Sequence, residues 1–177
     1  MACHRRLVKW IEETRFGVFW NVEETLMSIH RAKTEWQRNG MPFEPVKYSR
    51  AHRIEFEPSV ALAGNAAKEN LPQGAPHGPG ADPEQLFVAS LSACHMLWFV
   101  SLASSRKLIV NRYVDEAEGV LEKNSEGRMA MTRVTLRPAV EFAAPPSPAM
   151  LAELHHQAHE KCFIANSVRT EVIVEPR

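Results

Sequence analysis

The sequence predicts one α+β domain in which antiparallel sheet surrounds a buried central helix. Its 177 residues correspond to a single domain of ordinary size. With 45% hydrophobic and 24% charged residues, the chain can bury a core and is not disordered by composition. Strand-like and helix-like hydrophobic patterns follow one another in the order two strands, helix, two strands, helix, strand.

Two strands are predicted before the central helix. The first spans residues 29–36 and ends at an Asn-Gly turn, and the second spans residues 46–56 and contains valine, tyrosine, isoleucine and phenylalanine. We expect them to pair as a hairpin. Residues 57–82 are rich in proline and glycine, which predicts a loop throughout. A loop of that length usually has a function.

The sequence Asp82-Pro83-Glu84 marks the start of the central helix. It provides an N-cap carboxylate, a proline at the first helical position and an acid in the first turn. The helix is predicted from Pro83 to about Ser105, and apolar side chains occur on most of its faces. Serines and a histidine interrupt its apolar stretch. We therefore expect a buried helix rather than a membrane span, and no membrane partner.

The remaining elements are a second hairpin, a second helix and a final strand. The hairpin strands are predicted at residues 114–122 and 129–142. Two prolines then break the chain, and a Ser-Pro pair caps a helix over residues 148–161. Residues 168–175 alternate as the last strand.

Charge and cysteine content limit the class of protein. The 21 Lys and Arg residues balance the 21 Asp and Glu residues, so no overall basic field attracts nucleic acid. The first 26 residues lack the apolar run of a signal peptide, and three cysteines are too few for a secreted disulfide framework. We expect a cytoplasmic protein with an extension of unknown role at 1–26 and its folded domain at 27–177.

Two cysteines are the candidate reactive groups. Cys94 lies in the middle of the central helix, and Cys162 lies just beyond the second helix. A lone buried cysteine is most often a small hydrophobic residue. However, Glu84 lies ten positions before Cys94, close to three helical turns, which predicts that they share a face. In a cytosolic chain a pair of cysteines suggests a redox pair rather than a structural disulfide.

Three runs resemble the OsmC/Ohr family of organic hydroperoxide reductases. They are Asp-Pro-Glu-Gln-Leu-Phe at 82–87, Ser-Ala-Cys-His-Met at 92–96, and the segment from His155 to Val168. The resemblance extends over about residues 27–176. It implies an OsmC-like intertwined homodimer and a thiol peroxidase without a metal or organic cofactor. It also implies an organic hydroperoxide as substrate and a lipoylated or small-molecule dithiol as reductant.

The resemblance also assigns roles to individual residues. Cys94 resembles the thiol that attacks the peroxide, Glu84 the conserved acid of the family's site, and Cys162 the resolving thiol. Arg50 looks like the arginine that activates the thiol, with Arg53 a weaker match. Such a cation is needed because burial in an apolar helix raises the pKa of a thiol, whereas the thiolate is the nucleophile.

Two features depart from the hydroperoxide branch of the family. The Gly-Gly-Arg-Asp-Gly type of loop is absent, and His95 directly follows the first cysteine of the motif. Both departures favour the osmotically inducible branch or a more divergent one. The preferred peroxide therefore stays open.

Two alternatives to a peroxidase remain. His155 and His159 stand at i and i+4 with Cys162 three positions further on, a spacing that can hold zinc. A fourth ligand would come from Cys94 or His95. The other alternative is a catalytically inactive OsmC-like ligand-binding protein that keeps the fold without turnover.

Overall fold

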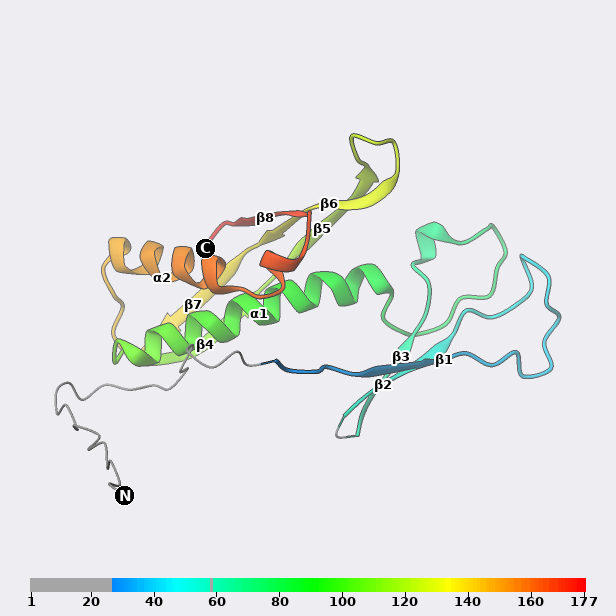
Figure 1. Cartoon of the computed structure of the whole chain (residues 1–177), viewed down its shortest axis with the longest axis horizontal. Coiled ribbons are helices and arrows are strands. Elements are labelled where there is room, and N and C mark those ends of the chain that lie inside the picture. The colour runs from blue at the N-terminus through cyan, green and yellow to red at the C-terminus, as the bar shows by residue number, and fades with distance from the viewer. Residues whose placement is uncertain (1–26, 58) are drawn as a thin grey trace, which may run out of the picture.

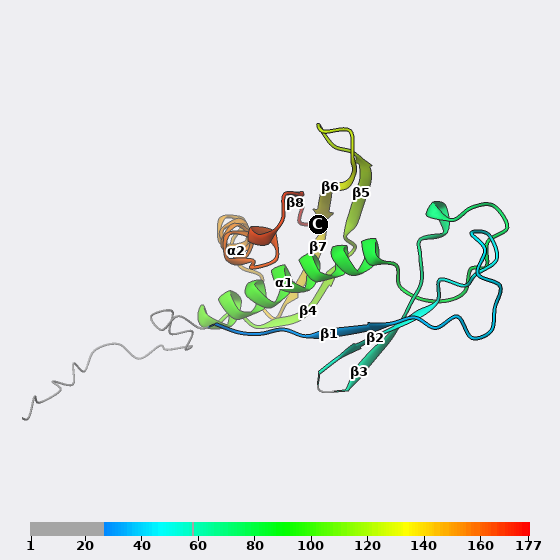
Figure 2. The same ribbon diagram turned by 45° about the vertical axis from the view of Figure 1, so that its right-hand side comes forward.

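The computed structural model describes residues 27–57 and 59–177, so the extension at 1–26 lies outside the described residues. A three-stranded arm projects from a body in which one long helix lies against a second helix and a long bent hairpin (Figures 1 and 2). The arm contains β1 (Ala32–Glu35), β2 (His52–Phe56) and β3 (Val60–Gly64). The body contains α1 (Pro83–Ser105), β4 (Val110–Asp115), β5 (Glu118–Lys123), β6 (Met129–Leu136), β7 (Pro138–Phe142), α2 (Pro148–Lys161) and β8 (Glu171–Val174). Single 3-10 turns lie at Lys68–Asn70 and Ala165–Ser167.

Both predicted helices are confirmed, with their caps. The Asp82 carboxylate accepts a hydrogen bond from the Gln85 amide at 2.7 Å, and the Gln85 side chain accepts one from the Asp82 amide at 3.2 Å. This reciprocal pair is a capping box, and it satisfies two backbone donors at the start of α1. At the start of α2, the Ser147 hydroxyl accepts a hydrogen bond from the Met150 amide.

The arm has one strand more than expected. β3 occupies residues 60–64, inside the segment predicted to be loop throughout. It pairs antiparallel with β2, from Phe56 opposite Val60 to His52 opposite Gly64. The prediction was wrong because β3 consists largely of alanine, leucine and glycine, and its strand conformation depends on the pairing with β2. β1 and β2 do form the predicted hairpin but are shorter than predicted.

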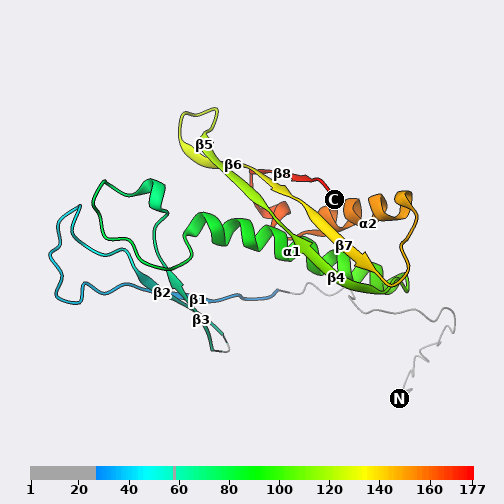
Figure 3. The ribbon, with the colours of Figure 1, turned by 180° about the vertical axis from the view of Figure 1, so that it is seen from behind.

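The second hairpin is also divided differently from the prediction. Each of its two predicted strands is split, so that β4 pairs with β7 and β5 pairs with β6 (Figure 3). At the division the Asp115 carboxylate accepts hydrogen bonds from the Arg137 amide at 2.6 Å and from the Ser92 hydroxyl at 2.5 Å. The last strand, β8, joins β6 in parallel, so the sheet is not antiparallel throughout.

Only one stripe of α1 is buried within a single chain. Leu91, His95, Phe99 and Ala103 recur every four residues and contact α2 and the hairpin strands. Leu97, on another face, is 65% exposed. By length and composition α1 could cross a membrane, but the core helices of globular proteins meet the same criteria. Ser92 and His95 on α1 form hydrogen bonds with Asp115 and His155 of the same chain, as expected for a helix packed inside a domain.

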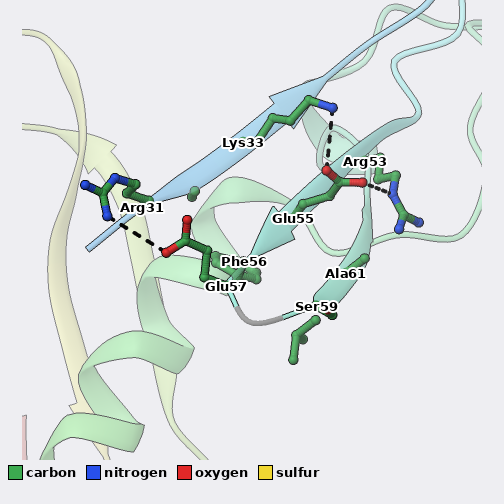
Figure 4. A pocket seen from close by; sticks show the side chains of 10 residues that line it. Arg31, Lys33, Arg53, Glu55, Phe56, Glu57, Ser59 and Ala61 are labelled. Carbon is green, nitrogen blue, oxygen red and sulfur yellow. Dashed lines mark hydrogen bonds and ion pairs between the residues drawn. The ribbon is translucent and has the colours of Figure 1, made fainter. Parts of the chain in front are cut away.

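The two faces of the arm differ in polarity. On one face Glu55 pairs with Lys33 at 3.5 Å and with Arg53 at 2.7 Å across a shallow hollow (Figure 4). Exposed ion pairs of this kind contribute little to stability. The other face carries Ile54 together with the exposed Phe56, Val60 and Leu62. No other element in the described part of the chain covers these three exposed side chains.

The contact between α1 and α2 contains a buried polar pair. His95 Nε2 and His155 Nδ1 are 3.2 Å apart, and the two residues are only 1% and 4% exposed. Burial lowers the pKa of both imidazoles to about 4, because the charged form would lose its hydration. The pair is therefore neutral at physiological pH.

We expect Asp82→Ala to lower the free energy of unfolding by about 1 kcal/mol, because the capping box at α1 is lost. Urea unfolding measures this loss. Asp82→Asn is the matched control, because its amide oxygen can still accept the bond from the Gln85 amide. Equal losses in both variants would show that the cap is not the stabilising interaction.

The histidine pair predicts a pH dependence of stability. The folded-state pKa of about 4 lies below the ordinary value of 6.5, so the unfolded chain binds more protons between these pH values. The stabilisation by the neutral pair is therefore fully present above pH 6.5 and decreases as the pH falls toward 4, at about 1.4 kcal/mol per pH unit for one titrating histidine. Denaturant unfolding at several pH values gives the free energy of unfolding of wild type and of the double variant His95→Phe/His155→Leu. The difference between their pH dependences measures the contribution of the histidine pair. An equal slope in both proteins would contradict the assignment.

Candidate functional site

The structure brings Cys94 and Cys162 together. Cys94 lies on α1 and is partly exposed, whereas Cys162 caps the C-terminal end of α2 and is 1% exposed. Both are free thiols, and Cys94 lies close enough to Cys162 to affect its pKa. Packing of α2 against α1 therefore places the two thiols next to each other.

The two thiols differ in their environment. Burial, and secondarily the neighbouring Cys94, raise the pKa of Cys162 to about 11. The Ala165 amide donates a hydrogen bond to Cys162 Sγ at 3.4 Å and partly opposes this shift. Cys162 is therefore a protonated thiol at neutral pH. Because Cys94 is the more exposed of the two, it is the thiol that a dissolved oxidant reaches first.

Aromatic side chains and one ammonium group surround the thiols. Trp98, one turn after Cys94, makes an edge contact with Phe163, with ring centroids 5.4 Å apart. Phe163 is 64% exposed, so this side of the site has an apolar rim. Lys161 Nζ lies 5.6 Å from the centre of the Trp98 ring. Lys161 was not among the predicted site residues, although its place directly before Cys162 in the sequence was the available signal.

Arg50 is held by its own segment of the chain. Its guanidinium donates hydrogen bonds to the Pro45 carbonyl at 3.0 Å and to the Tyr48 carbonyl, and it lies 4.2 Å from the centre of the Tyr48 ring. His52 Nδ1 donates to the Arg50 carbonyl at 2.9 Å. The His52 ring occupies the space where a side chain on Gly64 would lie, so this arrangement requires a glycine there.

Arg50 and Glu84 share a small hollow of about 300 Å³, which His52 and Asn65 also line. No ion pair joins Arg50 to Glu84 within the described residues, although both side chains border this space. The predicted arginine and the predicted acid are thus neighbours. They lie between the arm and the start of α1.

The structure does not bring these two groups to the thiols of the same chain. Ten residues of α-helix separate Glu84 from Cys94 by about 15 Å along the axis and turn them about 80° apart. The expectation that they share a helix face is therefore wrong, because ten residues make only about 2.8 turns. One chain therefore holds the candidate residues in two separate groups, the thiol pair and the Arg50–Glu84 hollow.

The zinc alternative has no support in the geometry. His155 directs Nδ1 toward His95 rather than toward a common point with His159 and Cys162. Across residues 27–57 and 59–177, no group of three or more His, Cys, Asp or Glu side chains is arranged to hold a metal ion.

A hollow of about 960 Å³ lies on another side of α1, against β5 and β6. Methionines and small side chains form its floor, and carboxylates including Glu84 border it. Cys94 is not among its lining residues, because it lies on the opposite face of the helix. The two thiols therefore do not open into this hollow.

Solved structures of low sequence identity share the fold. An organic hydroperoxide resistance protein from Elizabethkingia anophelis is 17% identical, with a TM-score of 0.63 over 86% of this chain and 96% of that one. The organic hydroperoxide resistance protein OhrB of Bacillus subtilis is 20% identical, with a TM-score of 0.60 over 85% and 98%. At this identity the likeness establishes the fold alone.

A stronger match comes from an OsmC-like protein of unknown function from Vibrio cholerae. It is 43% identical, with a TM-score of 0.81 over 85% of this chain and 100% of that one. No curated protein matches the sequence. The family model described as OsmC-like protein matches residues 76–177, which contain both cysteines and both helices. The chain therefore belongs to the OsmC-like protein family.

Proposed function

We propose that this protein is a thiol peroxidase that reduces organic hydroperoxides to alcohols. The observation that carries the proposal is the contact between a partly exposed Cys94 and a buried Cys162 at the interface of α1 and α2. A sulfur atom oxidised at Cys94 has a second thiol beside it. The names of the Elizabethkingia and Bacillus structures, which share this fold, agree with an organic hydroperoxide as substrate.

The reaction divides into two steps on the protein. The Cys94 thiolate attacks the terminal peroxide oxygen, the O–O bond breaks, and the alkoxide leaves as an alcohol after taking up a proton. Cys94 is then a sulfenic acid. Cys162 attacks its sulfur, the S–O bond breaks, water leaves, and a Cys94–Cys162 disulfide forms. A cytoplasmic dithiol then reduces the disulfide by thiol exchange, so the cycle requires no metal or organic cofactor.

The first step needs a positive charge beside the Cys94 thiolate. Arg50 and Glu84 are the residues carried over from the family, but their hollow is remote from Cys94 of the same chain. A second copy of the chain supplies them in our proposal. The exposed apolar face of the arm and the exposed Leu97 on α1 support a homodimer. Exposed apolar surface of this kind is typical of a protein–protein interface.

In this homodimer the partner's Arg50 faces Cys94, and the partner's Glu84 orients the guanidinium. A guanidinium suits this role because it stays charged and its planar fork can contact the thiolate and the departing oxygen together. Lys161 is the competing cation, since it already lies beside Trp98 near the thiols of its own chain. The two possibilities differ in whether the active site spans two chains.

The division of roles between the cysteines predicts different behaviour for two serine variants. We expect Cys94→Ser to abolish the consumption of cumene hydroperoxide. Cys162→Ser should react once and then accumulate sulfenic or over-oxidised Cys94, because no resolving thiol remains. Peroxide assays and intact-protein mass spectrometry measure both results. Equal residual turnover in the two variants would contradict these roles.

The position of the arginine predicts complementation between variants. Arg50→Met should slow peroxide reduction about 100-fold, a barrier increase of about 3 kcal/mol, because the Cys94 thiolate loses its cation. A purified heterodimer of one Arg50→Met chain and one Cys94→Ser chain should regain about half of the wild-type activity. In that dimer one site combines an intact Cys94 with the partner's intact Arg50.

Lys161→Met is the control for this experiment, and we expect it to keep most of the activity. The contrary result is an inactive heterodimer together with a Lys161→Met variant that reduces peroxide about 100-fold more slowly than wild type. The cation that activates Cys94 would then be Lys161 of the same chain. The site across two chains would then be refuted.

A further inference from the structure

The contact between α1 and α2 contains a buried histidine pair among mostly apolar side chains. At the C-terminal end of α1, the Arg106 guanidinium also donates a hydrogen bond to the Gln157 side chain of α2 at 2.7 Å. His95 Nε2 and His155 Nδ1 are 3.2 Å apart, and the rings are nearly parallel, with an interplanar angle of 6°. The second ring nitrogen of each histidine is buried and has no hydrogen-bond partner. The contact of α1 with α2 also buries Phe99, Ala103, Leu154 and Ala158. Among the described residues, the mutual hydrogen bond is therefore the hydrogen bond that orients the two imidazoles.

A directional bond restricts how α2 can slide along α1. Contacts among leucine, alanine and phenylalanine are non-directional, so they discriminate weakly between neighbouring registers of two helices. A slip of one helical turn moves every α2 side chain by about 5.4 Å and leaves both imidazoles without a partner. Buried polar residues fix the register of coiled-coil helices in the same way.

The thiols lie in the same interface as the histidines. Cys94 directly precedes His95 on α1, and Cys162 follows His155 by seven residues on α2, close to two full turns. His155 and Cys162 therefore lie on the same face of α2. The register that allows the histidine bond is the register in which Cys162 contacts Cys94.

We propose that the His95–His155 hydrogen bond sets the register of α2 on α1 and thereby holds Cys162 against Cys94 for disulfide formation. The two histidines are positioning residues that act on the second step. In that step the Cys162 thiol loses its proton and its sulfur attacks the Cys94 sulfenic sulfur. The S–O bond breaks, and hydroxide leaves with that proton as water. The inference rests on the proposed function, because that function supplies the sulfenic acid.

The test separates the two steps in rapid mixing with one equivalent of cumene hydroperoxide. In His155→Leu, the rate of Cys94 oxidation, read by trapping the sulfenic acid with dimedone, should stay as in wild type. The rate of disulfide formation should fall about tenfold or more, because a small misplacement of a reacting group has a large effect on rate. His155→Asn should restore the rate, since its amide lies near the position of His155 Nδ1.

Asp82→Ala is the control for lost stability. Asp82 caps the first turn of α1, at the opposite end of the helix from Phe99 and Ala103, which pack against α2. We expect this variant to unfold at lower urea concentration yet to form the disulfide at the wild-type rate. If Asp82→Ala or His155→Asn slows disulfide formation as much as His155→Leu, general loosening rather than the histidine bond is responsible. That result would overturn the inference.

Equilibration in glutathione redox buffer distinguishes this inference from the proposed function. Formation of the Cys94–Cys162 disulfide from oxidised glutathione requires no peroxide chemistry. If wild type ignores cumene hydroperoxide, the peroxidase proposal fails, but His155→Leu should still form less disulfide than wild type in the same buffer. Equal disulfide fractions and equal rates in wild type and His155→Leu would refute the positioning role.

Discussion

The packing of α2 against one stripe of α1 is the contact on which the candidate chemistry depends. It buries Phe99 and Leu154, pairs His95 with His155, and places Cys162 beside Cys94. Neither cysteine has a reactive partner from its own element. The two thiols are neighbours because two helices separated in sequence by the long hairpin meet along this stripe (Figure 1).

The same helix explains why one chain gives only part of a site. α1 is apolar on most faces, yet α2 and the hairpin cover only the face that contains Leu91 and Phe99. Its other face and the apolar face of the arm remain exposed in one chain. In the proposed homodimer, a second copy that covers these faces would also bring a second Arg50–Glu84 hollow, so the same contact would supply assembly and thiol activation.

Local signals in the sequence were sufficient for the helices. Asp82 and Ser147 are side-chain caps whose effect is confined to one turn, and both helices begin where these residues predict. β3 could not be predicted in the same way, because its alanines and glycine adopt the strand only through pairing with β2. The split in the second hairpin likewise depends on Asp115, which bonds to the distant Ser92 and Arg137.

For the candidate site, too, local sequence motifs predicted the residues but not how tertiary packing arranges them. Cys94, Cys162, Glu84 and Arg50 were predicted from motifs, but their grouping into a thiol pair and an Arg50–Glu84 hollow depends on how the arm and α2 pack. Counting helical turns predicted that Glu84 and Cys94 share a helix face, whereas they lie about 80° apart around the helix. The spacing of His155 and His159 left zinc binding as an alternative, but the partner of His155 is His95, which comes from the other helix.

Mapping the cysteines after a single oxidation tests the thiol-pair account most directly. The reduced protein is mixed with one equivalent of cumene hydroperoxide, quenched with acid, alkylated, digested and analysed by mass spectrometry. The account predicts one equivalent of cumyl alcohol and a peptide cross-link that joins Cys94 to Cys162. Unconsumed peroxide with both cysteines alkylated would contradict it.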